Sequence, residues 1–226
     1  MTRTIIIVTT CGRPEITRTC LNHLIERTPR AERDIVVVDN GSRDKTLDYI
    51  YALLRKGDIY RFLANKCDTV PQWQKSYAIQ EAVHLTRMEQ FDYFAWIDND
   101  IEVQKGWLTA ARDILKARPD VQVCSVHDDE EQDANHPTVV GTKIAGYDVK
   151  IRETANGALW VMRRAFFDMH GLPPAGQGIR GEAAEDWYYS GYFKERGVPF
   201  IVLPGYSTHH GRKDSAKKAA LKKLGK

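Results

Sequence analysis

The stretch Phe91–Val103, FDYFAWIDNDIEV, contains an apolar run that ends abruptly in Asp98, Asn99 and Asp100. The run YFAWI has the length and composition of a buried β-strand. Carboxylates at positions i and i+2 of a turn can both face a hard divalent cation such as Mg²⁺ or Mn²⁺. The alternatives are an aspartate that caps the helix expected near Gly106, or a solvated loop. The stretch therefore predicts a strand with two carboxylates at its C-terminal end, and metal binding is one interpretation of them.

Strands and helices are expected to alternate on both sides of this stretch. Short apolar, β-branched runs predict further strands, and segments with apolar residues at helical spacing predict helices. The expected strands span residues 4–10, 34–40, 60–65 and 121–126, and the expected helices span residues 14–28, 44–57, 71–87 and 105–119. This alternation over residues 1–126 predicts an α/β fold with a mostly parallel, Rossmann-like central sheet flanked by helices.

The pattern changes after residue 126. Residues 127–150 are polar, and no strand or helix is predicted there. A strand at 158–164, a short helix at 165–170, a helix at 185–197 and a strand at 198–205 are expected to follow. The Gly- and Pro-rich segment between residues 171 and 181 is either a loop that closes over a ligand or a loop without such a role.

Composition indicates an ordinary soluble domain with a basic end. The chain has 226 residues, of which 42% are hydrophobic and 28% charged. The net charge is +3, but residues 211–226 contain seven Lys or Arg and one Asp, so the other residues sum to −3. This tail either contacts phosphates of nucleic acid or an anionic lipid surface, or is a solvated terminus.

The cysteines and the apolar runs bear on the expected location. The four cysteines, Cys11, Cys20, Cys67 and Cys124, have no metal-binding spacing, so we expect free thiols in a reducing compartment. The first apolar run is too short for a secretory signal, and no run approaches the ~18 apolar residues of a transmembrane helix. We therefore expect a cytoplasmic protein.

Polar residues follow four of the expected strands. They are Thr9, Thr10 and Arg13 after the first strand, Asp39 and Asn40 after the second, Asn65 and Lys66 after the third, and Asp98 to Asp100. Ligands of parallel α/β sheets bind at the carboxyl ends of the strands, so we expect these groups to converge. Asp39 is able to accept hydrogen bonds from a base or a ribose; the alternative is an Asn-Gly turn in which Asp39 accepts backbone amides.

Three further positions carry candidate chemistry. Glu185 and Asp186 precede an aromatic helix and are candidates for a general base, or else acids that complement a helix N-terminus. His209 and His210 follow the last expected strand and are candidate metal ligands, or else hydrogen-bonded histidines near the core edge. Trp160 can stack on a sugar or base, although an interior aromatic is the more common role.

Several stretches, in this order and spacing, resemble glycosyltransferase family 2 and its GT-A fold. They are IIIVTTCGRPE, DIVVVDNGSRDKT, FDYFAWIDNDIEV with its DxD motif, NGALWVMRRAFF and EDWYYSGYFKERG. The resemblance runs from about residue 4 to residue 210. It implies one GT-A domain over residues 1–210, with a nucleotide-sugar-binding half (1–126), a small acceptor-side and catalytic half (127–210), and residues 211–226 as a basic tail.

The resemblance also implies roles for the candidate residues. Thr9 and Arg13 would line the nucleotide pocket, Asp39 would hold the base, typically uracil, and Asp98 would lie near the ribose and the metal. Asp100 would ligate Mn²⁺ or Mg²⁺, with one of His209 and His210 as a further ligand. Asp186, the second acid of the Glu185-Asp186 pair, would be the catalytic base.

These implications give one favoured function and two alternatives. The favoured function is a metal-dependent, inverting glycosyltransferase that uses a nucleotide diphosphate sugar, with UDP-sugar favoured. Its acceptor would be a glycan, a lipid-linked sugar or a hydroxylated base in DNA reached through the basic tail. The QxxRW motif of processive synthases is absent from the sequence. The alternatives are a binding module of the same fold without turnover and a sugar nucleotidyltransferase, although the Gly-rich phosphate loop typical of the latter is replaced by TTCGRPE.

Overall fold

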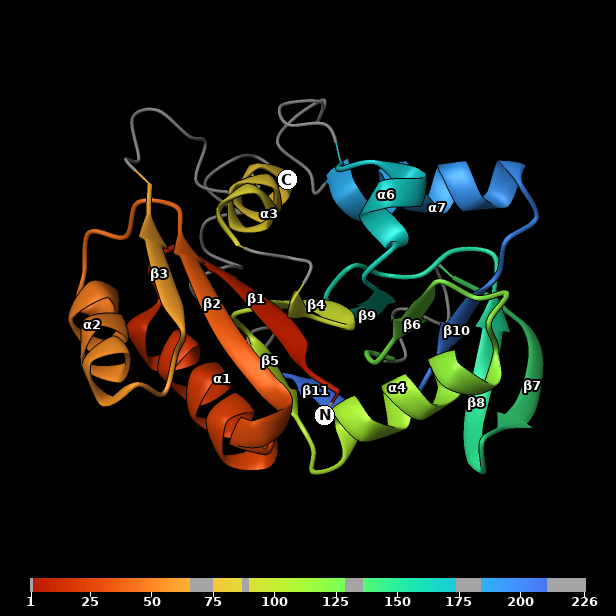
Figure 1. Cartoon of the computed structure of the whole chain (residues 1–226), viewed down its shortest axis with the longest axis horizontal. Coiled ribbons are helices and arrows are strands. Elements are labelled where there is room, and N and C mark those ends of the chain that lie inside the picture. Colours follow the sequence, from red (N-terminus) through yellow and green to blue (C-terminus); the bar gives the residue numbers. More distant parts are fainter. Residues whose placement is uncertain (1, 66–74, 87–89, 129–135, 174–183, 211–226) are drawn as a thin grey trace, which may run out of the picture.

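A computed structural model of the chain describes residues 2–65, 75–86, 90–128, 136–173 and 184–210, with only the backbone for residues 184–187. Its centre is a nine-stranded sheet in the order β3-β2-β1-β4-β9-β6-β10-β8-β7 (Figure 1). Only β9 (Leu159–Arg163) and β8 (Tyr147–Arg152) run against the direction of the other seven strands. The expected α/β fold with a large, mostly parallel sheet is thus confirmed.

The first half of the chain builds one side of the sheet by strand–helix alternation. Its elements are β1 (Thr4–Thr10), α1 (Pro14–Arg27), a 3₁₀ turn (Arg30–Glu32), β2 (Arg33–Asp39), α2 (Thr46–Lys56), β3 (Arg61–Ala64) and α3 (Lys75–Leu85). Pro14 begins α1, where its missing N–H costs nothing. Gly57 ends α2 in the left-handed conformation (φ 71°) that glycine adopts without strain. The expected strands and helices of this half are confirmed, with shifts of a few residues.

The middle strands are built from separated parts of the chain. β4 (Tyr93–Asp98) pairs with β1 in parallel, and β6 (Val123–Ser125) and β10 (Phe200–Val202) lie beyond β9. The helices of this half are α4 (Trp107–Ala117), α6 (Phe166–His170) and α7 (Ala184–Glu195). Helices α1, α2 and α4 cover one face of the sheet, and α3, α6 and α7 cover the other (Figure 1). Each face therefore has its own apolar core.

Two features were not expected from the sequence. Where residues 127–150 were expected to hold no strand, β7 (Thr138–Ile144) and β8, which continues to Arg152, form an antiparallel hairpin at the edge of the sheet. Its edge strand exposes six of its seven residues, so the segment carries little of the apolar signal that predicts a strand. A separate two-stranded sheet joins β5 (Ile101–Val103) to β11 (Ser207–His209). That short pairing brings the histidines to the aspartates.

The structure adds two observations on location. Cys11, Cys20 and Cys124 are free thiols, as expected, and Cys67 lies outside the described residues. In the described part of the chain, no helix has both the length and the apolar character needed to cross a membrane.

Candidate functional site

The carboxyl ends of β1, β2, β3 and β4 meet at one edge of the sheet. The strand register sets Thr9 beside Asp98 and Thr10 beside Asp39. Asn65 continues the row, because its side-chain amide donates to Asn40 Oδ1 at 3.0 Å. The predicted convergence is thus present for all four groups except Lys66, which lies outside the described residues.

Asn99 fixes the turn between the two aspartates. Its side chain is 8% exposed, and its amide donates to Thr10 Oγ1 at 3.1 Å and to Thr17 Oγ1 at 2.8 Å. These bonds tie the turn to the end of β1 and to the first turns of α1. The central residue of Asp98-Asn99-Asp100 is therefore a structural anchor, and the two carboxylates emerge on either side of it.

Asp100 lies between a cation and an imidazole. Its Oδ2 accepts a hydrogen bond from Arg13 Nη2 at 2.8 Å, while its Oδ1 lies 3.5 Å from His209 Nε2. The residue is only 7% exposed, so both neighbours act on it with little screening by water. Arg13 and His209 were both candidates from sequence, and the structure brings both to Asp100.

Asp98 has a different partner. Lys75, at the start of α3, places Nζ 2.7 Å from Asp98 Oδ1 and 2.6 Å from the carbonyl oxygen of Gly157. The lysine side chain is 9% exposed and the aspartate side chain 35%. Sequence reasoning missed Lys75, since a lone lysine in a helical segment carries no motif.

The two adjacent histidines take separate roles. The pairing of β11 with β5 turns His209 toward Asp100, and the backbone N–H of His210 donates to the Asp100 carbonyl at 3.0 Å. The His210 ring instead lies 3.9 Å from Glu102, which also contacts His23 Nδ1 at 2.7 Å. Of the two candidates, His209 is therefore the one whose ring reaches Asp100.

His127 is a further residue that the sequence did not reveal. It is 1% exposed, and its ring centroid lies 5.9 Å from that of His209. Ser207 donates its hydroxyl hydrogen to the Val126 carbonyl, so His127 Nδ1 must carry the hydrogen in its 2.9 Å contact with Ser207 Oγ. His127 is thus held by Ser207, the first residue of β11, close to His209.

The donor set was tested for a divalent cation. The described residues contain no group of three or more His, Cys, Asp or Glu side chains placed to hold a metal ion. They do contain the pair Asp100 Oδ1 and His209 Nε2, 3.5 Å apart. Mg²⁺ and Mn²⁺ sites of phosphate-handling enzymes often use one or two protein ligands and take the rest from phosphates and water. The pair fits such a cation.

Asp39 forms the turn that sequence analysis gave as the alternative. One oxygen accepts the backbone N–H groups of Gly41 (3.0 Å) and Ser42 (2.7 Å), and the other accepts the Ser42 hydroxyl. Ser42 Oγ also accepts the backbone N–H of Gly12 at 2.6 Å. Asp39 is 1% exposed, so its carboxylate links the ends of β1 and β2 in this structure.

Trp160 is a core residue, so its assignment to ligand binding was wrong. It is 0% exposed, its ring stacks on Trp96 with centroids 4.9 Å apart, and its Nε1 donates to the Asn156 carbonyl at 2.6 Å. It lies on β9, and its side chain points into the core beneath α7. The interior role named as its alternative is the correct one.

The remaining candidates lie partly or wholly outside the described residues. Glu185 and Asp186 are in the first turn of α7, and their side chains are outside the described part of the structure. The same holds for most of the Gly- and Pro-rich loop and for the basic tail. Their assignments stay predictions.

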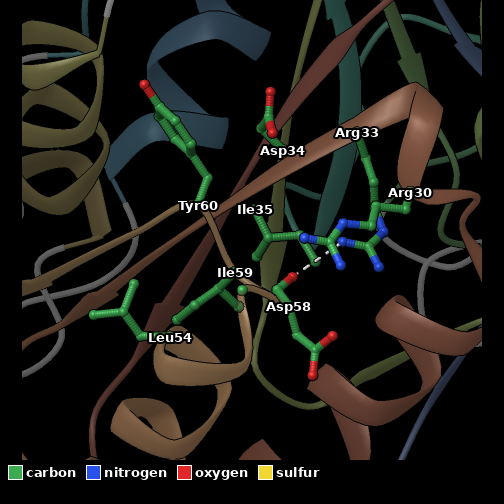
Figure 2. A pocket seen from close by; sticks show the side chains of 9 residues that line it. Arg30, Arg33, Asp34, Ile35, Leu54, Asp58, Ile59 and Tyr60 are labelled. Carbon is green, nitrogen blue, oxygen red and sulfur yellow. Dashed lines mark hydrogen bonds between the residues drawn. The ribbon is translucent and has the colours of Figure 1, made fainter.

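A cavity of ≈340 Å³ lies at the opposite edge of the sheet, near the start of β2 (Figure 2). Arg33 points into it and donates to the carbonyls of Thr28, Asp58 and Ile25 at 2.9, 3.2 and 3.2 Å. Burial lowers the pKa of Arg33; the charge of Asp58 opposes this shift, and that of Arg30 adds to it. Because Arg33 satisfies carbonyls at the C-terminal ends of α1 and α2, we interpret this region as structural.

The sequence model described as Glycosyl transferase family 2 matches residues 5–172. No curated protein matches the sequence.

Solved structures share the fold at low identity. The mannosyltransferase PcManGT from Pyrobaculum calidifontis, in complex with GDP-Man and Mn²⁺, has a TM-score of 0.66 and 18% identity over 89% of this chain. TarS of S. aureus has a TM-score of 0.63 and 16% identity over 92% of this chain, and its 1–349 fragment with UDP-GlcNAc has a TM-score of 0.61, with 18% identity over 91%. This chain spans 55% of the PcManGT chain, 37% of the TarS chain and 58% of the fragment.

Proposed function

The chain belongs to glycosyl transferase family 2, and on that premise we propose that it is a metal-dependent, inverting glycosyltransferase. Glycosyl transfer from a nucleotide sugar is supported at the level of the family and of the fold. We propose more narrowly that the donor is a UDP-sugar and that residues 1–126 bind it. Residues 127–210 would then supply the catalytic base and part of the acceptor site.

One observation carries the proposal. Asp100 Oδ1 and His209 Nε2 lie together at the carboxyl ends of the strands and offer two donor atoms to a metal ion. Small molecules bind to α/β sheets at these strand ends. Asp98 lies on the other side of Asn99 and faces the same edge. A divalent cation held there would neutralise the negative charge that develops on the leaving diphosphate.

The chain's own residues would divide the remaining work. Asn40, Asn65 and the turn around Asp39 offer hydrogen-bonding groups for the base and ribose. Asp186 would accept the proton of the acceptor hydroxyl as that oxygen bonds to the anomeric carbon. The bond from that carbon to the diphosphate oxygen breaks at the same time, and attack from the opposite face inverts the centre.

Support for the donor comes from the structural neighbours. PcManGT was solved with GDP-Man and Mn²⁺, and the TarS fragment with UDP-GlcNAc. Both are nucleoside diphosphate sugars, so we propose this class, with Mn²⁺ or Mg²⁺ as the cation. We propose a glycan, a lipid-linked sugar or a hydroxylated DNA base as the acceptor, and the free thiols favour a reducing, cytoplasmic setting.

A donor panel tests the proposal. The protein is incubated with UDP-, GDP- and TDP-sugars and Mn²⁺, and release of nucleoside diphosphate is measured. We expect slow hydrolysis of one donor that stops when Mn²⁺ is chelated and is lost in Asp100→Ala. Asp48→Ala, an exposed aspartate on α2, is the matched control and should retain activity.

Two other results would redirect the assignment. Nucleotide-sugar binding without turnover, with every acceptor class supplied, would indicate a binding module. Release of pyrophosphate from a nucleoside triphosphate and a sugar phosphate would indicate a nucleotidyltransferase. Retention on DNA that weakens with salt and with deletion of residues 211–226 would favour the DNA acceptor.

A further inference from the structure

We propose that Arg13 competes with the divalent cation for Asp100, so that the donor diphosphate recruits the metal by drawing Arg13 away. The inference rests on the proposed function and adds a positioning role for one residue of the site. It predicts that metal and nucleotide bind poorly alone and well together.

The guanidinium of Arg13 contacts two side chains of the Asp98-Asn99-Asp100 turn. Its Nη2 donates to Asp100 Oδ2 at 2.8 Å and to Asn99 Oδ1 at 3.0 Å. The Asp100 side chain is 10% exposed, and the Arg13 side chain 36%. Arg13 thus covers one oxygen of a nearly buried carboxylate, while its own side chain keeps contact with solvent.

The backbone of Arg13 is fixed, so the guanidinium is the part that can move. Arg13 has φ 59° and ψ 61°, and it is one of two non-glycine residues with positive φ in the described parts of the chain. Such a conformation costs about 1–3 kcal/mol and persists only where the surroundings impose it. The Arg13 carbonyl accepts the first-turn N–H of Thr17 at 3.0 Å, so the backbone of Arg13 is tied to the start of α1. The strained position aims a long cationic side chain at the strand ends.

Electrostatics favours exchange over permanent pairing. Each carboxylate of Asp98-Asn99-Asp100 already has one cation, Lys75 on Asp98 and Arg13 on Asp100. A metal ion that binds Asp100 without a nucleotide is repelled by the positive charge of Arg13 beside that carboxylate. A diphosphate supplies negative charge and oxygen pairs that suit a guanidinium fork, so Arg13 gains a new partner as the metal takes Asp100.

Lys75 is not expected to exchange in the same way. Its side chain is 9% exposed and is held by the Gly157 carbonyl as well as by Asp98. Arg13 holds only side chains of the turn itself, Asn99 and Asp100, in the contacts described. The difference in burial and in partners assigns the exchange to Arg13.

Mn²⁺ binding measured by electron paramagnetic resonance tests the inference without relying on turnover. Wild type, Arg13→Gln and Arg13→Lys are titrated with Mn²⁺, with and without saturating UDP. Without UDP, we expect Arg13→Gln to bind Mn²⁺ about tenfold more tightly than wild type. With UDP, wild type should gain at least about tenfold in Mn²⁺ affinity and Arg13→Gln much less, a coupling of ordinary size. Arg13→Lys keeps the charge and should stay close to wild type without UDP.

Two controls keep the test sharp. Arg18→Gln removes the same charge from a nearby side chain on α1 that pairs with Glu15 at 3.7 Å and packs on Tyr49, and it should change neither affinity. Arg13→Gly removes the side chain at a position whose φ suits glycine, so it provides a folded variant if Arg13→Gln unfolds. It should behave as Arg13→Gln does.

The sign of the change decides between exchange and support. If the Arg13→Gln and Arg13→Gly proteins bind Mn²⁺ more weakly than wild type without UDP, Arg13 holds Asp100 for the metal. If they bind it equally well, Arg13 does not affect the metal, and either result overturns the inference. Both results leave the proposed function intact. If wild type binds no Mn²⁺ even with a nucleotide bound, the metal part of the proposed function fails together with the inference.

Discussion

Lys75 and Asp98 form an ion pair of 2.7 Å between the start of α3 and the end of β4. The same ammonium group donates to the Gly157 carbonyl just before β9, so one buried cation joins three segments of the chain. Removal of the ammonium group would take a positive charge from Asp98 and a hydrogen-bond donor from the Gly157 carbonyl. The pair therefore serves the fold and the site together.

We expect Lys75→Met to lower the free energy of unfolding by about 2 kcal/mol. A broken buried ion pair costs more than this, but Asp98 is 35% exposed and is partly solvated. Urea unfolding measures the change. Lys116→Met, on an exposed lysine of α4 that pairs with Asp113 at 3.8 Å, should change stability by less than about 0.5 kcal/mol. Equal effects of the two substitutions would show that the Lys75–Asp98 pair contributes no more to stability than an exposed ion pair.

His209→Ala should weaken Mn²⁺ binding in the presence of UDP by about 10–100-fold, as expected for loss of one metal-site group. The reason is the 3.5 Å separation between His209 Nε2 and Asp100 Oδ1. His210→Ala, whose ring lies toward Glu102, should have the smaller effect, and His84→Ala, exposed on α3, none. A larger loss with His210→Ala than with His209→Ala would reverse the assignment.

Trp160→Phe should destabilise the protein by about 2 kcal/mol and leave UDP affinity unchanged. The substitution reduces core volume and leaves the Asn156 carbonyl without its indole donor. Urea unfolding and nucleotide titration give the two quantities. A stable variant with weakened UDP binding would restore a ligand-binding role for this residue.

The fold should lose stability as the pH falls below about 6.5, in part through His170. Its ring packs on Phe166, Phe193 and Tyr192, and burial, followed by the charge of Arg196, lowers its pKa. The folded protein therefore takes up this proton less readily than the unfolded chain, and the contribution is fully present only above the unfolded pKa. Unfolding free energies of His170→Gln measured from pH 7.5 to 5.5 should fall less steeply than those of wild type. Parallel curves for the two proteins would contradict the prediction, and His84→Gln is the exposed control.

Much of the fold follows from local sequence signals. The spacing of apolar residues predicts the alternating strands and helices of residues 4–85. The parallel half of the sheet, and the polar residues at the carboxyl ends of its strands, were therefore predictable. The antiparallel β9 at the centre was predicted as a strand, but its neighbours depend on contacts between distant segments. The β7–β8 hairpin was missed because polar residues predominate over residues 127–150 and the apolar residues of β7 are few and mainly exposed.

The candidate site divides in the same way. Asp98, Asp100 and His209 stood out because they follow apolar strands. The structure brings His209 to Asp100, whereas Asp98 pairs with Lys75. Lys75 and His127 could not be found, since only tertiary packing places them beside these strands. Trp160 was misassigned because a ring at a strand end looks alike in sequence whether it faces a ligand or the core.

The pairing of β11 with β5 gives any bound metal a second effect. Three residue pairs join β11 to β5. Because this pairing joins segments that are far apart in the chain, it closes a long loop, which costs conformational entropy. A cation shared by Asp100 and His209 would fasten the two strands, and its binding free energy would add to their docking. Amide hydrogen exchange of Ser207, Thr208 and His209 would then slow when metal and nucleotide are present. The metal would then stabilise the tertiary pairing of β11 with β5. The site itself would form only at the stage of folding at which these two strands pair.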